Sequence, residues 1–83
     1  KLTYQDTEDL RLADDYAELG ELSSARKIYE KLAALNDVYC KGHALIGLGT
    51  IAEKQRESVQ AEAFFQKAKQ VFVSNLGRDF PDS

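Results

Sequence analysis

The feature that most constrains the fold of this 83-residue chain is an internal repeat at an offset of 36 residues. In each copy a large and a small apolar residue are followed by a small residue, then by an aromatic residue four positions later. A repeat of this length, made of one helical hairpin, is typical of a helical solenoid, in which hairpins stack on one another. The paired positions are Leu12 and Leu48, Ala13 and Gly49, Tyr16 and Ala52, Ala25 and Ala61, Ile28 and Phe64, Tyr29 and Phe65, and Leu32 and Ala68.

Apolar residues recur at helical spacing in four segments, about 5–19, 22–35, 37–55 and 58–76. No segment alternates with the period of a strand. Because only one or two residues link the segments, successive helices must run antiparallel. We therefore expect an all-α fold of two stacked antiparallel helical hairpins, with a closed four-helix bundle as the alternative that the repeat disfavours.

Glycines and small polar residues suggest where these helices begin and end. Gly20 and Gly77 suit the left-handed conformation that closes many helices. Gly47 and Gly49 lie inside the third segment, where each costs roughly 1 kcal/mol relative to alanine, so we expect a neighbouring helix to approach closely there. Cap candidates are Thr3 with Asp6, or Thr7, for the first segment, and Ser23 or Ser24 for the second.

Both copies resemble the tetratricopeptide repeat, a helix-turn-helix unit of 34 residues. The resemblance implies one domain over 1–83, with a first repeat at about 7–36, a second at about 41–76 and a tail at 77–83. Asp9 and Leu45 stand where the family usually has tryptophan, and Arg56 stands at the turn position that Gly20 fits. The residues that the resemblance assigns to the repeat core are Leu12, Tyr16, Ala25, Tyr29, Leu48, Gly49, Ala61, Phe65 and Ala68.

The tail Leu76-Gly77-Arg78-Asp79-Phe80-Pro81-Asp82 is similar to the link between the longer repeats of the kinesin-light-chain type. In that arrangement another repeat follows. We therefore expect the chain to be a fragment of a larger scaffold or adaptor.

The resemblance also implies a binding surface, because the first helix of each such hairpin lines the concave face. We expect this face to take a peptide or protein segment, with apolar anchors near Leu10 and Ile46. Asp14 would repel a terminal carboxylate, so we expect no binding of acidic C-terminal tails there. The residues assigned to the concave face are Leu10, Asp14, Ala17, His43, Ile46, Thr50 and Glu53.

Charge and residue content argue against several other functions. A net charge of −3 is unlike the basic surface of a nucleic-acid-binding protein. The apolar stretch 44–52 is too short to span a bilayer. Cys40 and His43 lie three residues apart, but there is no second cysteine or histidine to complete a metal site. We therefore expect no enzyme activity, cofactor or metal.

Self-association is the alternative function. Two repeats are near the lower limit for burying a continuous core, and a terminal repeat normally needs a polar outer face. The last helix instead carries several apolar residues close together, which could form a homodimer interface. These residues are Val71, Phe72, Val73 and Leu76.

Overall fold

Four α-helices account for nearly all of the described chain: α1 (Tyr4–Glu18), α2 (Leu22–Ala33), α3 (Val38–Lys54) and α4 (Ser58–Asp79). The structure is a computed structural model that describes residues 4–35 and 37–79, with side chains for 6–35 and 37–74. The all-α prediction is confirmed, and helices α1 to α3 begin and end within two residues of the predicted segments.

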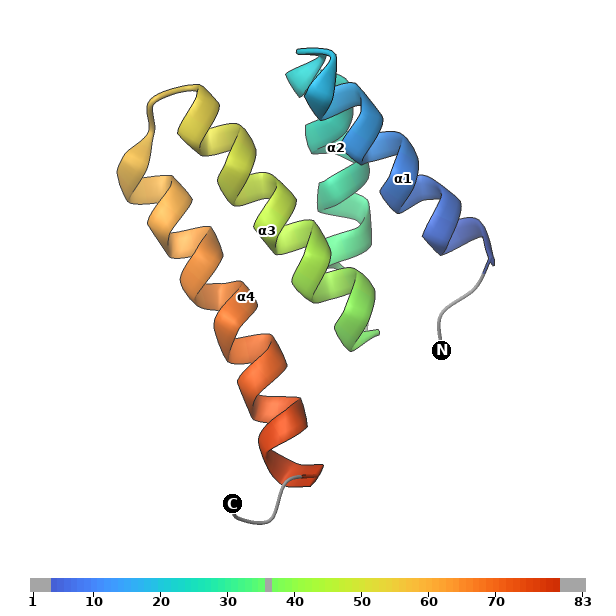
Figure 1. Ribbon diagram of the computed structural model, residues 1–83, viewed down its shortest axis with the longest axis vertical. Coiled ribbons are helices and arrows are strands. Elements are labelled where there is room, and N and C mark those ends of the chain that lie inside the picture. Colours follow the sequence, from blue (N-terminus) through green and yellow to red (C-terminus); the bar gives the residue numbers. More distant parts are fainter. Residues whose placement is uncertain (1–3, 36, 80–83) are drawn as a thin grey trace.

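The helices form two hairpins, α1–α2 and α3–α4, which pack side by side (Figure 1). Helix α3 is the central element, because it contacts α1, α2 and α4. Within the described residues α4 contacts neither α1 nor α2, so the ring of contacts that defines a closed bundle is missing. The arrangement is therefore the stacked one.

The two turns within the hairpins have the same backbone geometry 36 residues apart. Gly20 (φ 88°) and Arg56 (φ 63°) both adopt the left-handed conformation. The next amide donates back to the helix in each case, from Glu21 to the Tyr16 carbonyl and from Glu57 to the Ala52 carbonyl, both at 2.8 Å. Each turn is thus a Schellman motif, which satisfies the free carbonyl groups of the preceding helix.

Several predicted helix ends differ from the observed ones. Asp37 caps α3 by accepting a hydrogen bond from the Cys40 amide at 3.1 Å. In contrast, Glu21 precedes α2 without a side-chain cap bond, and its own amide donates to the Tyr16 carbonyl in the Schellman turn. The predicted caps Thr7, Ser23 and Ser24 therefore lie inside helices, as does Gly77, since α4 continues to Asp79; Thr3 lies outside the described residues.

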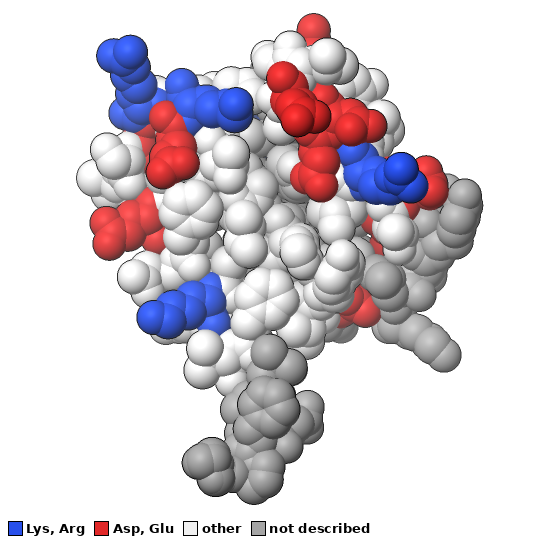
Figure 2. Space-filling model, viewed as in Figure 1, with Lys and Arg blue, Asp and Glu red and all other residues white. Residues whose placement is uncertain are grey.

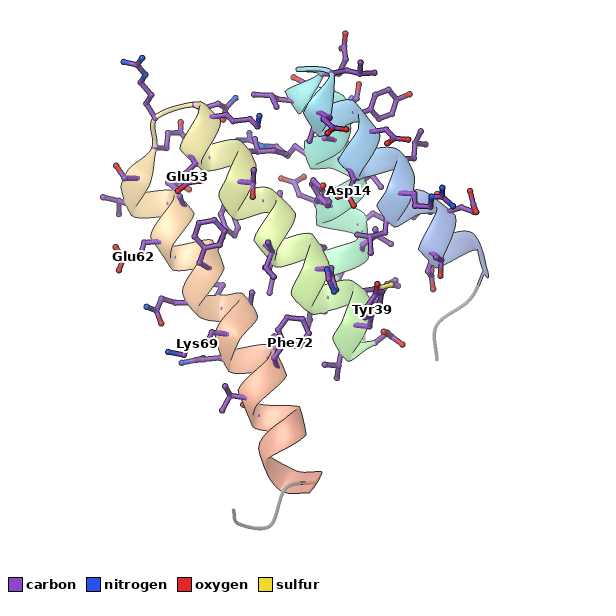
Figure 3. All side chains as sticks on the ribbon, in the orientation of Figure 1. Asp14, Tyr39, Glu53, Glu62, Lys69 and Phe72 are labelled. Atoms are coloured by element: carbon purple, nitrogen blue, oxygen red, sulfur yellow. The ribbon has the colours of Figure 1, made fainter. Side chains whose placement is uncertain are left out.

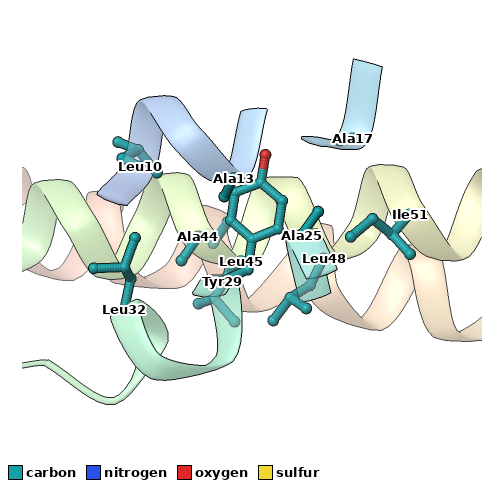
Figure 4. Packing of buried hydrophobic residues seen from close by; sticks show 11 residues of the cluster. Leu10, Ala13, Ala17, Ala25, Tyr29, Leu32, Ala44, Leu45, Leu48 and Ile51 are labelled. Carbon is teal, nitrogen blue, oxygen red and sulfur yellow. The ribbon is translucent and has the colours of Figure 1, made fainter. Parts of the chain in front are cut away.

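Small residues and one aromatic ring build the centre of the core (Figure 4). Ala13, Ala25 and Ala44 are fully buried, so their helices approach closely around the ring of Tyr29, which is 2% exposed. The cluster extends along all four helices. Its buried members are Leu10, Ala13, Ala17, Ala25, Tyr29, Leu32, Ala44, Leu45, Leu48, Ile51 and Ala68.

The glycines of α3 are positions where aromatic rings contact the helix backbone. A Cβ at Gly47 would lie closer than 3.0 Å to the ring of Tyr29, and one at Gly49 would meet Phe65 in the same way. A neighbouring helix was expected close to these two glycines, and the nearest atoms belong to an aromatic ring that such a helix carries. Each ring occupies the space that a side chain at the glycine would fill.

Position in the stack determines which repeat-core residues are buried. Leu12 was expected in the core, but it is 45% exposed, whereas its counterpart Leu48 is 5% exposed because α2 packs against α3. No helix of the described chain covers the corresponding side of α1, so the Leu12 prediction is wrong. Of the others, Tyr16 and Phe65 are half-buried, and Ala25, Tyr29, Leu48, Gly49, Ala61 and Ala68 are buried.

Candidate functional site

An open groove of about 450 Å³ runs between α1 and α3. Its α3 wall carries residues on successive turns from His43 to Lys54, a span of roughly 16 Å at 1.5 Å per residue. That length matches about five residues of an extended peptide. We name it the α1–α3 groove; it is lined by Asp14, Ala17, Glu18, Tyr29, His43, Ile46, Gly47, Thr50 and Lys54.

The phenol of Tyr29 connects the core to this groove. It rises from α2, passes the backbone of Gly47, and donates its hydroxyl hydrogen to Asp14 Oδ1. Burial raises the pKa of Tyr29 above its usual value, and the hydrogen bond to Asp14 and the negative charge of that residue act in the same direction. Tyr29 therefore remains a neutral donor that fixes the Asp14 carboxylate in place, because the buried ring holds the hydroxyl still.

The polar groups of the groove differ between its walls. From α1 come the carboxylates of Asp14 and Glu18, and from α3 come His43, Thr50 and Lys54. Thr50 donates its hydroxyl hydrogen to the Ile46 carbonyl at 3.0 Å, which leaves the oxygen as an acceptor. The α1 wall therefore favours cationic or donor groups.

The charged side chains on the face of the molecule that carries the groove are distributed in the same way. Figure 2 shows acidic side chains gathered over the end of α1 and basic ones over the turn between α3 and α4. A ligand in the groove would meet the negative group on its α1 side. Lys54, at the end of α3, is the positive charge in the lining.

Most of the predicted concave-face residues line the α1–α3 groove: Asp14, Ala17, His43, Ile46 and Thr50. Leu10 does not, because it is 7% exposed and belongs to the core. Glu53 does not line the groove either. It lies on the side of α3 that faces α4, whereas Asp14 points from α1 toward α3 (Figure 3). Of the two predicted apolar anchors, only Ile46 therefore lines the groove.

Sequence reasoning missed four lining residues: Glu18, Tyr29, Gly47 and Lys54. Glu18 and Lys54 are related by the offset of 36, so a comparison of the repeats could have found them together. Tyr29 was assigned to the core, where its ring does lie. Only the absence of a side chain at Gly47 lets its hydroxyl reach the groove, and the sequence did not show which ring passes there.

Aromatic side chains continue the surface beyond His43. The His43 ring lies 4.4 Å from that of Tyr39 and 5.9 Å from that of Phe72, measured between centroids. Phe72 in turn rests on Gly42 of α3, in the space between α3 and α4 (Figure 3). His43 therefore stands at the junction of the groove and an aromatic cluster of Tyr39, His43 and Phe72.

Cys40 lies behind this surface and is fully buried. Burial raises the pKa of its thiol, and the negative charges of Asp37 and Asp6 add to the effect. His43 is exposed, so the two side chains do not converge on one site. Among the described side chains, no three histidine, cysteine or carboxylate groups are placed to hold a metal ion.

In the described part of the chain, no helix combines the length and the apolar character needed to cross a membrane.

Comparisons with models of protein families, with curated proteins and with solved structures found no match for this chain.

Proposed function

We propose that this chain is a protein-interaction module of the tetratricopeptide type, which binds a peptide or protein segment rather than catalysing a reaction. The observation that carries the proposal is the α1–α3 groove, where residues expected on the concave face surround one open volume. The recurrence of the Schellman turn after 36 residues supports the family assignment.

The chemistry of the groove suggests how such a segment would be held. Ile46 is 39% exposed and offers an apolar contact, while Asp14 is held by Tyr29 and needs no reordering to accept a hydrogen bond. A preorganised acceptor reduces the entropy lost on binding. We infer that the ligand places an apolar side chain on Ile46 and a donor on Asp14.

Peptide selection followed by mapping tests the proposal. Peptides would be selected from a displayed random library against the immobilised domain, and the affinity of the selected peptides measured by fluorescence anisotropy. Ile46→Asp should weaken binding about tenfold or more, because it removes the apolar contact and adds a charge. Val59→Asp is the matched control, since Val59 is 84% exposed on α4 and outside the groove.

Amide chemical shifts recorded during a titration with a selected peptide locate the contact. We expect the largest changes at Asp14, Ile46 and Thr50. Equal affinity of both variants, with shift changes outside the α1–α3 groove, would refute the proposal.

A further inference from the structure

A second groove, separate from the first, is lined by residues from the end of α2, the start of α3 and the second half of α4. Its volume is about 530 Å³, and it shares no lining residue with the α1–α3 groove. We name it the α2–α4 groove; it is lined by Ala33, Val38, Lys41, Leu45, Lys67, Gln70, Val71 and Ser74.

The lining of the α2–α4 groove combines apolar and positively charged groups. Leu45 is buried, and Val38 and Val71 are half-buried, so apolar carbon forms part of the surface between the helices. Among the described residues, the ionisable groups in the lining are two lysines, Lys41 from α3 and Lys67 from α4. The groove is thus positive although the chain carries a net charge of −3.

Neither lysine is neutralised by a described side chain. No carboxylate of the described residues lies within ion-pair distance of Lys41 or Lys67. The ammonium of Lys67 lies 6.0 Å from the centroid of the Phe64 ring, a cation–π distance that leaves its charge available. Two unpaired positive charges on opposite walls of one groove are complementary to an acidic ligand.

We propose that the α2–α4 groove binds an acidic segment of a partner protein, whose carboxylates pair with Lys41 and Lys67 while an apolar side chain packs against Leu45 and Val71. The apolar surface is recessed between helices, so it fits an inserted side chain. A lipid surface would instead require apolar groups that protrude into the bilayer. This binding is independent of the function proposed for the α1–α3 groove.

The test uses a fluorescein-labelled peptide with leucines at helical spacing and glutamates between them, together with its counterpart in which lysine replaces every glutamate. We expect the acidic peptide to bind the protein more tightly than the basic one. The double variant Lys41→Glu/Lys67→Glu should weaken acidic-peptide binding about tenfold or more, because two attractions become repulsions. The control, Lys27→Glu/Lys69→Glu, changes the net charge equally at exposed lysines outside the groove, and Figure 3 shows Lys69 pointing away from the other helices.

Lys67→Glu alone, at an exposed position, replaces the double variant if the latter does not fold. Shift changes should appear at Lys41, Leu45 and Val71 with the acidic peptide. Equal weakening by the groove and control variants would show nonspecific charge attraction and overturn the proposal. So would tighter binding to vesicles of anionic phospholipid than to the peptide, or shift changes confined to the α1–α3 groove.

Discussion

Arg56 ends α3 in the backbone conformation with which Gly20 ends α1. An L-residue with a side chain loses roughly 1–2 kcal/mol in the left-handed region, whereas glycine does not. Arg56→Gly should therefore raise the free energy of unfolding by about 1 kcal/mol, after allowing for the greater freedom of glycine in the unfolded chain. Urea unfolding followed by circular dichroism measures the change.

The equivalent turn provides the matched control. Gly20→Ala introduces a Cβ at a positive φ, where nothing lies within 4 Å of the added atom, so its cost is conformational. It should lower the free energy of unfolding by about 1 kcal/mol. If Arg56→Gly were neutral while Gly20→Ala destabilised, the two turns would not be equivalent.

Tyr29 should make stability sensitive to alkaline pH. Its folded-state pKa lies above the ordinary value of about 10, so above that pH the unfolded state releases a proton that the folded state retains. The unfolded state then binds fewer protons, and stability falls as pH rises. The contribution is fully present below about pH 10 and is lost progressively toward the raised folded-state pKa.

Urea unfolding at about pH 8 and about pH 11 tests this against Tyr29→Phe, which cannot ionise. We expect wild type to lose more stability than Tyr29→Phe over this interval. Tyr39→Phe serves as the matched control, because it removes a hydroxyl group at a tyrosine that is 48% exposed. An identical pH dependence of wild type and Tyr29→Phe would contradict the assignment.

At the scale of helices, Ala25 and Ala61 determine how closely the two members of each hairpin pack. Their exposed fractions are 0% and 3%, and they are related by the offset of 36. Replacing either by leucine should overpack the hairpin and cost about 1–3 kcal/mol of unfolding free energy. Thermal and urea unfolding measure the loss, with Ala63→Leu at an exposed position of α4 as control. A neutral effect at both buried alanines would argue against the repeat alignment.

Helix identity was predictable because the apolar periodicity and the turn residues agree, as at Gly20. The ends of the helices were less predictable than their existence. Ser23 is a good cap residue by type, yet the residue at the N-cap position of α2 is Glu21, which directly follows the Schellman turn at Gly20. Gly77 resembles a helix stop, but glycine inside a helix costs only about 1 kcal/mol, so α4 continues past it.

The candidate site was predictable where one helix face determines it. Residues of α3 at helical spacing, His43, Ile46 and Thr50, line the α1–α3 groove as expected. The predicted positions of Leu10 and Leu12 are reversed. Leu10 was expected on the concave face but is buried, and Leu12 was expected in the core but is exposed. Which side of α1 is covered depends on how the second hairpin packs against the first, and spacing within α1 carries no information on that.

For the whole molecule, the placement of the described apolar side chains on α4 predicts a monomer. Val71 is half-buried beside the α2–α4 groove, and Phe72 is half-buried against Gly42, so these two face different neighbours. Val59 and Val73 are the exposed valines, and they lie 14 residues, or roughly 21 Å, apart along the helix. Leu76 has no described side chain.

A dimer built on the described part of α4 would need a larger continuous apolar patch than its two exposed valines supply, since even weak specific interfaces bury on the order of 1,000 Å² in total. Sedimentation velocity across a hundredfold range of protein concentration should therefore give a constant monomer mass. Val73→Asp should leave that mass unchanged. A mass that rises with concentration and returns to the monomer value in Val73→Asp would instead establish α4 as a self-association surface.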